Sequence, residues 1–255
     1  MSSADDAAIR IPKAAELVAD TLRRRIVTGE YDADELLPPE GTLMSTFNVA
    51  RTTIRDAFRM LESEGLIVVR RGAGGGARVR PPGIGLVADY AGVLLQYRGA
   101  TLEDVHMARI LVETPAARLL AERSEKDKKK IVARLRAALD DETAAMNDAA
   151  ALTRAEGRFH QLIVELTGND TLLMLSAVAN RIIAEQVARA MGAKGKDATA
   201  KHYKEAHRAH ERLVDLIAGG DAQAAETLWR RHLEGGLAHL ASGDKAAKTV
   251  LDVMS

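Results

Sequence analysis

The stretch that decides the fold of this chain is residues 36–80, LLPPEGTLMSTFNVARTTIRDAFRMLESEGLIVVRRGAGGGARVR. Two short helical patterns separated by a tight turn are followed by two short strands that flank a glycine-rich tip. Apolar residues of the second helix recur at i, i+3, i+4 and i+7 and define an inner face: Ile54, Ala57, Phe58 and Leu61. Gly65 then ends this helix as a C-terminal cap. The pattern predicts a winged helix-turn-helix.

The other face of the second helix carries arginine and threonine near its N-terminus. These residues are Arg51, Thr52, Thr53 and Arg55. Arginine can bind a guanine edge with two hydrogen bonds or bind a phosphate, and threonine can donate a hydrogen bond to a phosphate. We therefore expect this helix to enter the major groove of double-stranded DNA.

The charge of the chain is distributed unevenly. Its 255 residues include 36 Lys+Arg and 36 Asp+Glu, so the formal net charge is zero. Residues 51–80 nevertheless contain seven arginines and three acidic residues, which gives a local balance of +4. A local basic patch on a neutral protein is typical of a regulator that binds DNA at chosen sites. The aromatic content of 3% argues against a protein that binds single strands by base stacking.

Composition also indicates the cellular compartment in which we expect the protein. The chain contains no cysteine, which excludes disulfides and thiolate zinc sites. The N-terminal segment is polar and acidic, with no apolar signal region, and no apolar run approaches the roughly 20 residues that a membrane span requires. We expect a cytoplasmic protein without a membrane partner.

The predicted fold is mainly α, with two domains. Residues 1–80 form the winged helix-turn-helix and include a first helix at about 12–28. The sequence PPGIG at 81–85 reads as a linker. Residues 86–242 show helical periodicity throughout and predict an all-α bundle of six to seven helices, and residues 243–255 form a tail. The expected helices of the bundle are approximately 86–97, 101–122, 125–146, 148–167, 170–191, 198–218 and 221–241. The charged run at 125–130 is expected to be a solvated helix face.

Three predicted helices of the bundle each direct a histidine toward the core. Glu156 and His160 lie at i and i+4 on one inward face, and His210 and His232 lie on apolar stripes of two later helices. Burying several imidazoles without partners would cost about 1–3 kcal/mol for each unsatisfied group. A shared divalent transition metal removes that cost, and Zn, Ni, Mn or Fe would suit three nitrogens and one oxygen. The alternative is a set of separate hydrogen-bonded core histidines.

Other polar residues of the bundle allow more than one interpretation. Arg109 and Glu113 lie at i and i+4, so they either form an ion pair within the helix or leave Arg109 free to bind the carboxylate of an organic acid. His207 is a ligand, a supporting residue or neither. The remaining histidines are expected at the surface or in ordinary packing: His106, His202 and His239.

The N-terminal half resembles the GntR family of bacterial regulators. The matching strings are LPPE at 37–40 and VARTTIRDAFRMLESEGL at 49–66, and the resemblance to the FadR-type branch, which carries an FCD domain, covers about residues 12–241. It implies DNA contacts by Arg51, Thr52, Thr53 and Arg55 in the recognition helix and by Arg71 and Gly72 at the wing. The chain departs from the family at Gly41, where a basic residue often contacts DNA.

The C-terminal half resembles the FCD domain in three places. These are RFH at 158–160, TGN at 167–169, and the regular spacing of His210, Asp221 and His232. The resemblance implies metal ligands at positions 156, 160, 210 and 232. Position 156 is Glu where the family usually has Asp.

The leading hypothesis is a homodimeric repressor that binds a palindromic operator. A small organic acid would complete the metal coordination, with help from Arg109 and Asn169, and would release the DNA. One alternative is the same DNA-binding role with a metal-free domain that binds an apolar or acyl ligand. A remote alternative is a metal-dependent enzyme fused to a DNA-binding head. No motif supplies a general base or nucleophile, so no catalytic residue is predicted.

Overall fold

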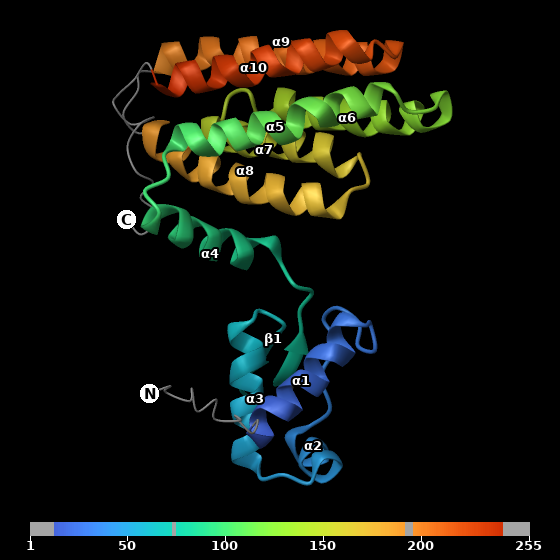
Figure 1. Ribbon diagram of the computed structural model, residues 1–255, viewed down its shortest axis with the longest axis vertical. Coiled ribbons are helices and arrows are strands. Elements are labelled where there is room, and N and C mark those ends of the chain that lie inside the picture. Colours follow the sequence, from blue (N-terminus) through green and yellow to red (C-terminus); the bar gives the residue numbers. More distant parts are fainter. Residues whose placement is uncertain (1–12, 73–74, 192–195, 242–255) are drawn as a thin grey trace, which may run out of the picture. The chain divides into compact units, whose positions relative to one another are not determined.

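The computed structural model describes residues 13–72, 75–191 and 196–241, with side chains omitted for residues 185–203 and 237–241. The chain divides into two compact units, Met1–Leu86 and Val87–Ser255. Within the described residues the structure is mainly helical, and its one sheet has two strands (Figure 1). The predicted fold class is confirmed. The first 12 residues and the expected tail at 243–255 lie outside the described residues.

The first unit is a winged helix-turn-helix. Its elements are α1 (Ala14–Val27), α2 (Glu40–Phe47), α3 (Arg51–Ser63), β1 (Ile67–Arg70) and β2 (Gly76–Val79). The two strands are antiparallel, in a register that runs from Ile67 opposite Val79 to Arg70 opposite Gly76. Leu36 adds an isolated bridge to Arg78 on the outer side of β2. Helix α3 is therefore the recognition helix predicted from the sequence, and the hairpin is the wing.

The apolar face of α3 holds this unit together. All four residues of the predicted inner face are at most 5% exposed, and they share one core with Val18, Leu22 and Ile26 of α1. Asn48, with φ 52°, ends α2 in the left-handed conformation, which turns the chain within three residues into α3. Gly65, with φ 72°, ends α3 as predicted.

Two features fix the wing. A Cβ atom at Gly75 would lie 2.4 Å from the carbonyl oxygen of Arg70, so only glycine fits this position of the hairpin. The side chain of Glu62 on α3 accepts a hydrogen bond from the amide of Val69 at 2.9 Å. This bond anchors β1 to the recognition helix.

The second unit is a helical bundle. Its helices are α4 (Ile84–Tyr97), α5 (Leu102–Ala121), α6 (Glu125–Ala145), α7 (Ala149–Glu165), α8 (Asp170–Met191), α9 (Lys196–Gly219) and α10 (Ala222–Ala241). The seven predicted segments all appear, with ends that differ from the expected ones by two residues or fewer. Helix α4 begins at Ile84, inside the segment expected to be the linker at 81–85, so the non-helical connection is shorter than predicted.

Helix α5 is the central element of the bundle. It packs against α7, α8, α9 and α10, and α6 packs against α7 and α9. The main core contains a group of side chains without exposed surface: Leu120, Leu135, Phe159, Ile163, Leu213, Ile217 and Trp229. Because these helices are long and closely packed, polar side chains on their inner faces are brought together.

One residue of the charged run at 125–130 is not solvated. Lys128 is 7% exposed, and its Nζ lies 2.6 Å from Glu125 Oε1. The prediction of a wholly solvated face was wrong at this position, because the long side chain can keep its charge paired while its stem is buried. No helix among the described residues is both long and apolar enough to cross a membrane.

Candidate metal centre and DNA-binding face

Three histidines from three helices converge inside the bundle. One coordinating atom from each of His160 on α7, His210 on α9 and His232 on α10 lies within 4.8 Å of the other two. The Nε2 atoms of His210 and His232 are 3.2 Å apart, and those of His232 and His160 are 3.4 Å apart. Metal–nitrogen bonds of about 2.0–2.1 Å in a tetrahedral site separate ligand nitrogens by roughly 3.4 Å. These two separations therefore match the spacing of metal ligands.

Buried carboxylates bind the other ring nitrogen of two of these histidines. His160 Nδ1 lies 2.7 Å from Glu113 Oε2, and His210 Nδ1 lies 2.8 Å from Glu142 Oε1. Neither glutamate has exposed surface. A carboxylate accepts the Nδ1 proton, which fixes the tautomer and leaves a lone pair on Nε2.

The arrangement of lone pairs tests whether these residues fit a metal. Because Nδ1 of His160 and of His210 donates to a carboxylate, the Nε2 atom of each ring in its neutral form presents a lone pair toward His232. One proton on His232 Nε2 can satisfy only one of them. A cation at the point of convergence satisfies all three nitrogens at once. The donor set therefore fits a transition metal that accepts imidazole.

Glu113 links the histidines to a buried cation. Its Oε1 lies 2.8 Å from Arg109 Nε, and its Oε2 accepts a further hydrogen bond from Trp229 Nε1 at 3.3 Å. Arg109 is 9% exposed. Arg109 forms the ion pair within α5, as one of the two interpretations predicts, and it also faces the interior of the bundle, while its contact with an effector stays a prediction.

Aromatic rings enclose the three histidines. The ring of Trp229 has its centroid 4.7 Å from that of His232 and 4.8 Å from that of His160. Phe159 stacks on His210 at 4.4 Å with an interplanar angle of 5°. These contacts restrict ring rotation, so the orientation of the imidazoles is set by packing as well as by hydrogen bonds.

Burial keeps two of these imidazoles, those of His160 and His232, neutral. It lowers the pKa of His160 well below the usual value of 6.5, with a further decrease from the positive charge of Arg109. Burial also lowers the pKa of His232, helped by the neighbouring His210 and His160. Neutral imidazole is the form that binds metals, so these two histidines are in the ligand form at neutral pH.

Glu156 lies in the same interior but is not one of the converging groups. Its Oε1 is buried without a hydrogen-bond partner, and burial raises the pKa of its carboxyl to about 8, with a smaller contribution from the charge of Glu142. The group of converging atoms consists of the three histidines alone within the described part of the chain. Metal ligation by Glu156 therefore stays a prediction.

The other candidates of the bundle have defined places. Asn169 is exposed at the start of α8, where its side-chain oxygen accepts a hydrogen bond from the amide of Leu172 at 3.0 Å, so its described role is that of a helix cap. Its role toward an effector stays a prediction. His207 Nδ1 lies 2.8 Å from Glu142 Oε2, which places His207 beside the carboxylate that supports His210. The side chains of His202 and His239 lie outside the described residues.

The sequence analysis did not identify the roles of two buried residues near the three histidines. Glu142 was not singled out, although it continues the buried stripe of Ile131 and Leu135 on α6, and a carboxylate on an apolar stripe is the signal that could have found it. His106 was expected at the surface or in ordinary packing. It is 3% exposed, both ring nitrogens lack a partner among the described residues, and burial lowers its pKa to about 4.

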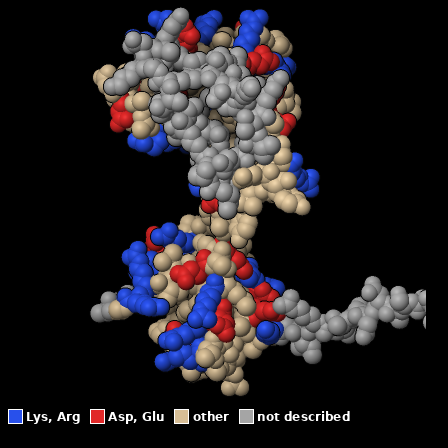
Figure 2. Space-filling model, turned by 90° about the vertical axis from the view of Figure 1, so that its left-hand side faces the viewer, with Lys and Arg blue, Asp and Glu red and all other residues tan. Residues whose placement is uncertain are grey.

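The predicted DNA contacts lie on the outside of the winged unit. Arg51 and Arg55 have side-chain exposures of 60% and 59%. Thr52 is exposed, Thr53 is half-buried, and Arg71 and Gly72 are exposed at the wing. Figure 2 shows Lys and Arg side chains over this unit, with acidic side chains among them. The structure places all six residues in one unit, and their DNA contacts remain predictions.

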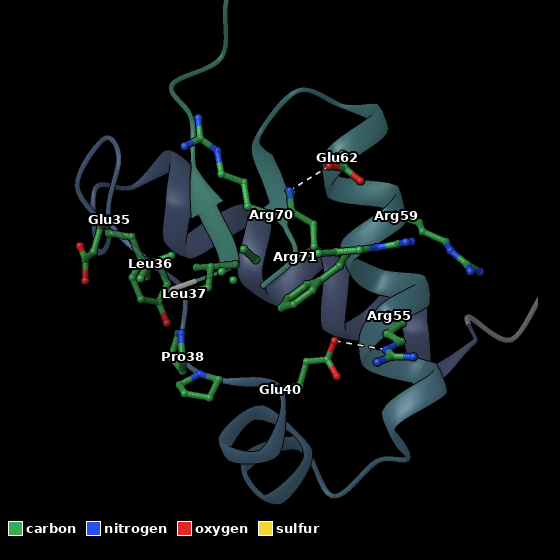
Figure 3. Close-up of a pocket in the computed structure, with 17 residues that line it drawn as sticks. Glu35, Leu36, Leu37, Pro38, Glu40, Arg55, Arg59, Glu62, Arg70 and Arg71 are labelled. Atoms are coloured by element: carbon green, nitrogen blue, oxygen red, sulfur yellow. Dashed lines mark hydrogen bonds and ion pairs between the residues drawn. The ribbon is translucent and has the colours of Figure 1, made fainter. Parts of the chain in front are cut away.

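A cleft of about 930 Å³ separates the recognition helix from the wing (Figure 3). Its lining includes four arginines, Arg55, Arg59, Arg70 and Arg71, together with Glu35, Glu40 and Glu62. The side chains therefore surround a space of mixed charge. At Gly41, beside this cleft, an added Cβ would meet no atom within 4 Å, so packing does not require glycine there.

Family models match both units. The model "Bacterial regulatory proteins, gntR family" matches residues 14–76, and the model "FCD domain" matches residues 104–235. The chain belongs to the GntR family, in its FCD-domain branch. It is a transcriptional regulator with a DNA-binding domain, and it is not an enzyme.

Individual relatives support the assignment of this chain to the GntR family. It is 27% identical to the HTH-type transcriptional repressor NanR of Escherichia coli K12 over 226 residues, which cover 87% of this chain and 82% of the relative. The NanR repressor of Cronobacter sakazakii is 28% identical over 227 residues, covering 87% and 83% of the two chains. The solved structure of Streptococcus agalactiae GntR has a TM-score of 0.64 at 23% identity and covers 87% of this chain and 98% of that one, which shows the shared fold.

Two ion pairs on α5 have the same spacing and distance but different burial, and they give a matched stability test. We expect Glu113→Gln to destabilise the metal-free protein by about 3–5 kcal/mol, because it leaves the buried Arg109 without a counter-charge. The control is Glu122→Gln, which removes one partner of Arg118 at the same 2.8 Å distance, from a pair in which both side chains are 44% exposed, and leaves Arg118 paired with Glu226 at 3.0 Å. Urea unfolding followed by circular dichroism should show no resolved change for the control. Equal effects of the two variants would contradict the expectation.

The buried His106 predicts an acid-dependent loss of stability. The unfolded chain takes up a proton near pH 6.5, whereas folded His106, beside Arg109, Glu113 and His160, takes it up only near pH 4. Acidification through this window therefore favours unfolding, by about 2 kcal/mol at pH 5 for this residue. Urea unfolding at pH 7 and pH 5 in the presence of a chelator measures the effect. Between pH 7 and pH 5, the free energy of unfolding of His106→Leu should fall by about 2 kcal/mol less than that of the wild type. Identical pH dependence of the two proteins would rule out a buried neutral His106.

Proposed function

We propose that this chain is a metabolite-responsive repressor that binds a palindromic operator as a homodimer. A small organic acid, bound at a metal ion in the bundle, would release the DNA. The observation that carries the proposal is the convergence of three Nε2 atoms, two of them on rings whose Nδ1 is held by a buried carboxylate. A ligand can release DNA only if it binds the DNA-free geometry more tightly, and a site within the packed bundle can differ between two states.

The metal would be a divalent transition metal, with Zn, Ni, Mn and Fe as candidates. His160, His210 and His232 would hold it, and Glu156 on the same helix as His160 would supply the oxygen ligand. The buried ion pairs contain two carboxylates, Glu113 and Glu142, and one guanidinium, so a cation also balances charge. The bound metal would offer a coordination position to a carboxylate.

The polarity of the interior supports a small acid as the effector. The one hydrogen bond described for Arg109 uses its Nε, which leaves the two terminal nitrogens for a carboxylate. His106 and Glu156 add buried polar atoms that have no hydrogen-bond partner within the described part of the chain. A polar ligand could satisfy such atoms and an acyl chain could not, so the metal-free apolar alternative has less support. Asn169 remains the second proposed effector contact.

Repression and dimerisation rest on separate observations. The relatives at 27–28% identity are named as repressors. Four large apolar side chains recur along one side of α4 with exposures of 45–90%: Val87, Tyr90, Leu94 and Tyr97. Exposed apolar surface of this kind favours association with a second copy. A two-fold symmetric dimer in turn requires a two-fold symmetric operator. We expect such a regulator to act in the cytoplasm.

The recognition helix would read the operator in the major groove. Arg51, Thr52, Thr53 and Arg55 would contact bases and phosphates, and Arg71 and Gly72 would contact the DNA at the wing. The exposure of α3 on its polar side and its firm packing on the apolar side support this docking.

Arg51→Ala tests the docking. The variant should bind the operator with an affinity lower by about 1–3 kcal/mol, because one base or phosphate contact is lost. The operator is first obtained by selection from a randomised duplex library, and affinity is then measured by fluorescence anisotropy. Arg158→Ala is the control, since it removes an arginine of similar exposure, 58% against 60%, from the bundle. Unchanged affinity of Arg51→Ala would contradict the docking.

Metal analysis tests the bundle site. Mass spectrometry of protein reloaded with each candidate metal should find about one ion per chain in the wild type and none in His210→Ala. Trp229 is the single tryptophan and lies beside the three histidines, so Ni²⁺ should quench its fluorescence in a saturable way. His232→Ala serves as a second variant in case His210→Ala does not fold.

His207→Gln is the matched control for the metal site. It alters a histidine that contacts the same carboxylate, Glu142, without belonging to the converging group. It should retain the metal and the quenching. Absence of metal from the wild type after reloading, or equal binding by His210→Ala, would refute the site and direct the effector search to apolar ligands.

A further inference from the structure

Glu40 occupies a central position on the DNA-binding face, although it is not one of the proposed DNA contacts. It is the first residue of α2 and follows Pro38 and Pro39. It lines the cleft between the recognition helix and the wing, and in Figure 3 its carboxylate points toward α3. An acidic group at this place repels the phosphates of any DNA that docks there, so its presence calls for an explanation.

Glu40 binds two arginines of the recognition helix at the same time. Its Oε1 lies 3.2 Å from Arg55 Nε, and its Oε2 lies 3.5 Å from Arg51 Nε. Both contacts use Nε, on the inner edge of the guanidinium. The outer edge, with its two terminal nitrogens, is then available for the two parallel hydrogen bonds by which arginine recognises guanine.

The local structure gives Glu40 the rigidity that such a role needs. The two prolines restrict the backbone before it, and the N-terminus of α2 stabilises a carboxylate in the first turn. Its side chain is 30% exposed, half as much as the two arginines at 60% and 59%. Rigid placement matters because a long arginine side chain that is free to rotate loses conformational entropy when it binds a base.

A neighbouring pair shows what an ordinary surface contact looks like on the same helix. Asp56 and Arg59 lie one turn apart on α3, with exposures of 52% and 79%, and their contact uses the terminal Nη1 of the arginine. This pair joins two residues of one helix, and it occupies the edge of the guanidinium, formed by the terminal nitrogens, with which an arginine would recognise a base. Glu40 instead reaches from α2 to α3 and leaves that edge free.

We propose that Glu40 is a positioning residue for sequence readout. It orients Arg51 and Arg55 toward base edges, and its negative charge weakens binding to DNA that offers no guanines at the matching positions. Correct DNA gains bidentate hydrogen bonds from oriented arginines, whereas other DNA meets only the repulsion. Glu40 thus raises the ratio of specific to non-specific affinity more than the affinity itself. This inference rests on the proposed contacts of Arg51 and Arg55.

The test compares Glu40→Gln with Asp56→Asn in the full-length protein. Each variant removes one negative charge from the DNA-binding unit. The probes are the selected operator duplex and a scrambled duplex of the same composition, with affinities measured at several salt concentrations. Glu40→Gln should bind the scrambled duplex more tightly and the operator no better, so that the specificity ratio falls about tenfold. Asp56→Asn should strengthen both affinities alike and keep the ratio.

Glu40→Asp separates charge from orientation. The shorter side chain keeps the negative charge but does not reach both arginines, so it should preserve weak non-specific binding while losing discrimination. Repeating the selection with Glu40→Gln should show lost preference at the base pairs that Arg51→Ala and Arg55→Ala also affect. Lost preference at a different base pair would mean that Glu40 reads a base itself, and it would overturn the positioning role.

The outcomes separate a failure of the positioning role of Glu40 from a failure of the proposed DNA contacts. If Arg51→Ala and Arg55→Ala leave operator binding unchanged, the proposed DNA contacts fail. If those variants weaken binding while Glu40→Gln keeps the wild-type ratio, only the positioning role fails. Thermal unfolding of each variant checks that the winged unit is intact.

Discussion

Glu113 has no exposed surface, and its two oxygens serve Arg109, His160 and Trp229 at once. A buried carboxylate is unfavourable unless it is paired and hydrogen-bonded, and here three helices supply the partners. The same carboxylate fixes the tautomer of His160, so the availability of one Nε2 lone pair depends on it. Removal of Glu113 would leave a buried guanidinium uncompensated and an imidazole without a fixed tautomer.

This arrangement connects ligand binding with helix packing. Arg109 and Glu113 lie on α5, which contacts α6, α7, α8, α9 and α10. A carboxylate that bound the terminal nitrogens of Arg109 would share the guanidinium with Glu113, and Glu113 also holds His160 on α7. A change at the proposed effector site would therefore reach two helices through one side chain. Coupling of this kind requires a contiguous network with more than one arrangement, and a shared carboxylate provides one.

The winged unit uses electrostatics differently, because its charges are exposed and screened by salt. Its basic residues give attraction to any DNA, while the exposed acidic groups limit that attraction. Mutual ion pairs such as Glu40 with Arg55 contribute little to stability at the surface. Their effect lies in the orientation of side chains that meet the DNA, so charge pattern rather than net charge decides what this unit can recognise.

Much of the fold could be predicted from local patterns. The inner face of α3, its glycine cap and the seven helical segments of the bundle follow from periodicity and from capping residues, which depend on neighbours three or four positions apart. Inward histidines were predicted on the same grounds. Position 156 shows the limit of the method, because an inward-facing carboxylate on α7 need not meet the point where the three imidazoles converge.

Local sequence patterns predict the helix-turn-helix with its wing, the helical segments of the bundle and the helix faces on which the histidines lie. Contacts between distant residues come from the packing of the helices: Glu113 and Glu142 hold two of the imidazoles, His106 is buried without a partner among the described residues, and Glu40 lies between two arginines of α3. The physical reason is distance along the chain. Periodicity assigns a residue to a face of its own helix, whereas contacts such as His210 with Glu142, 68 positions apart, depend on how several helices pack.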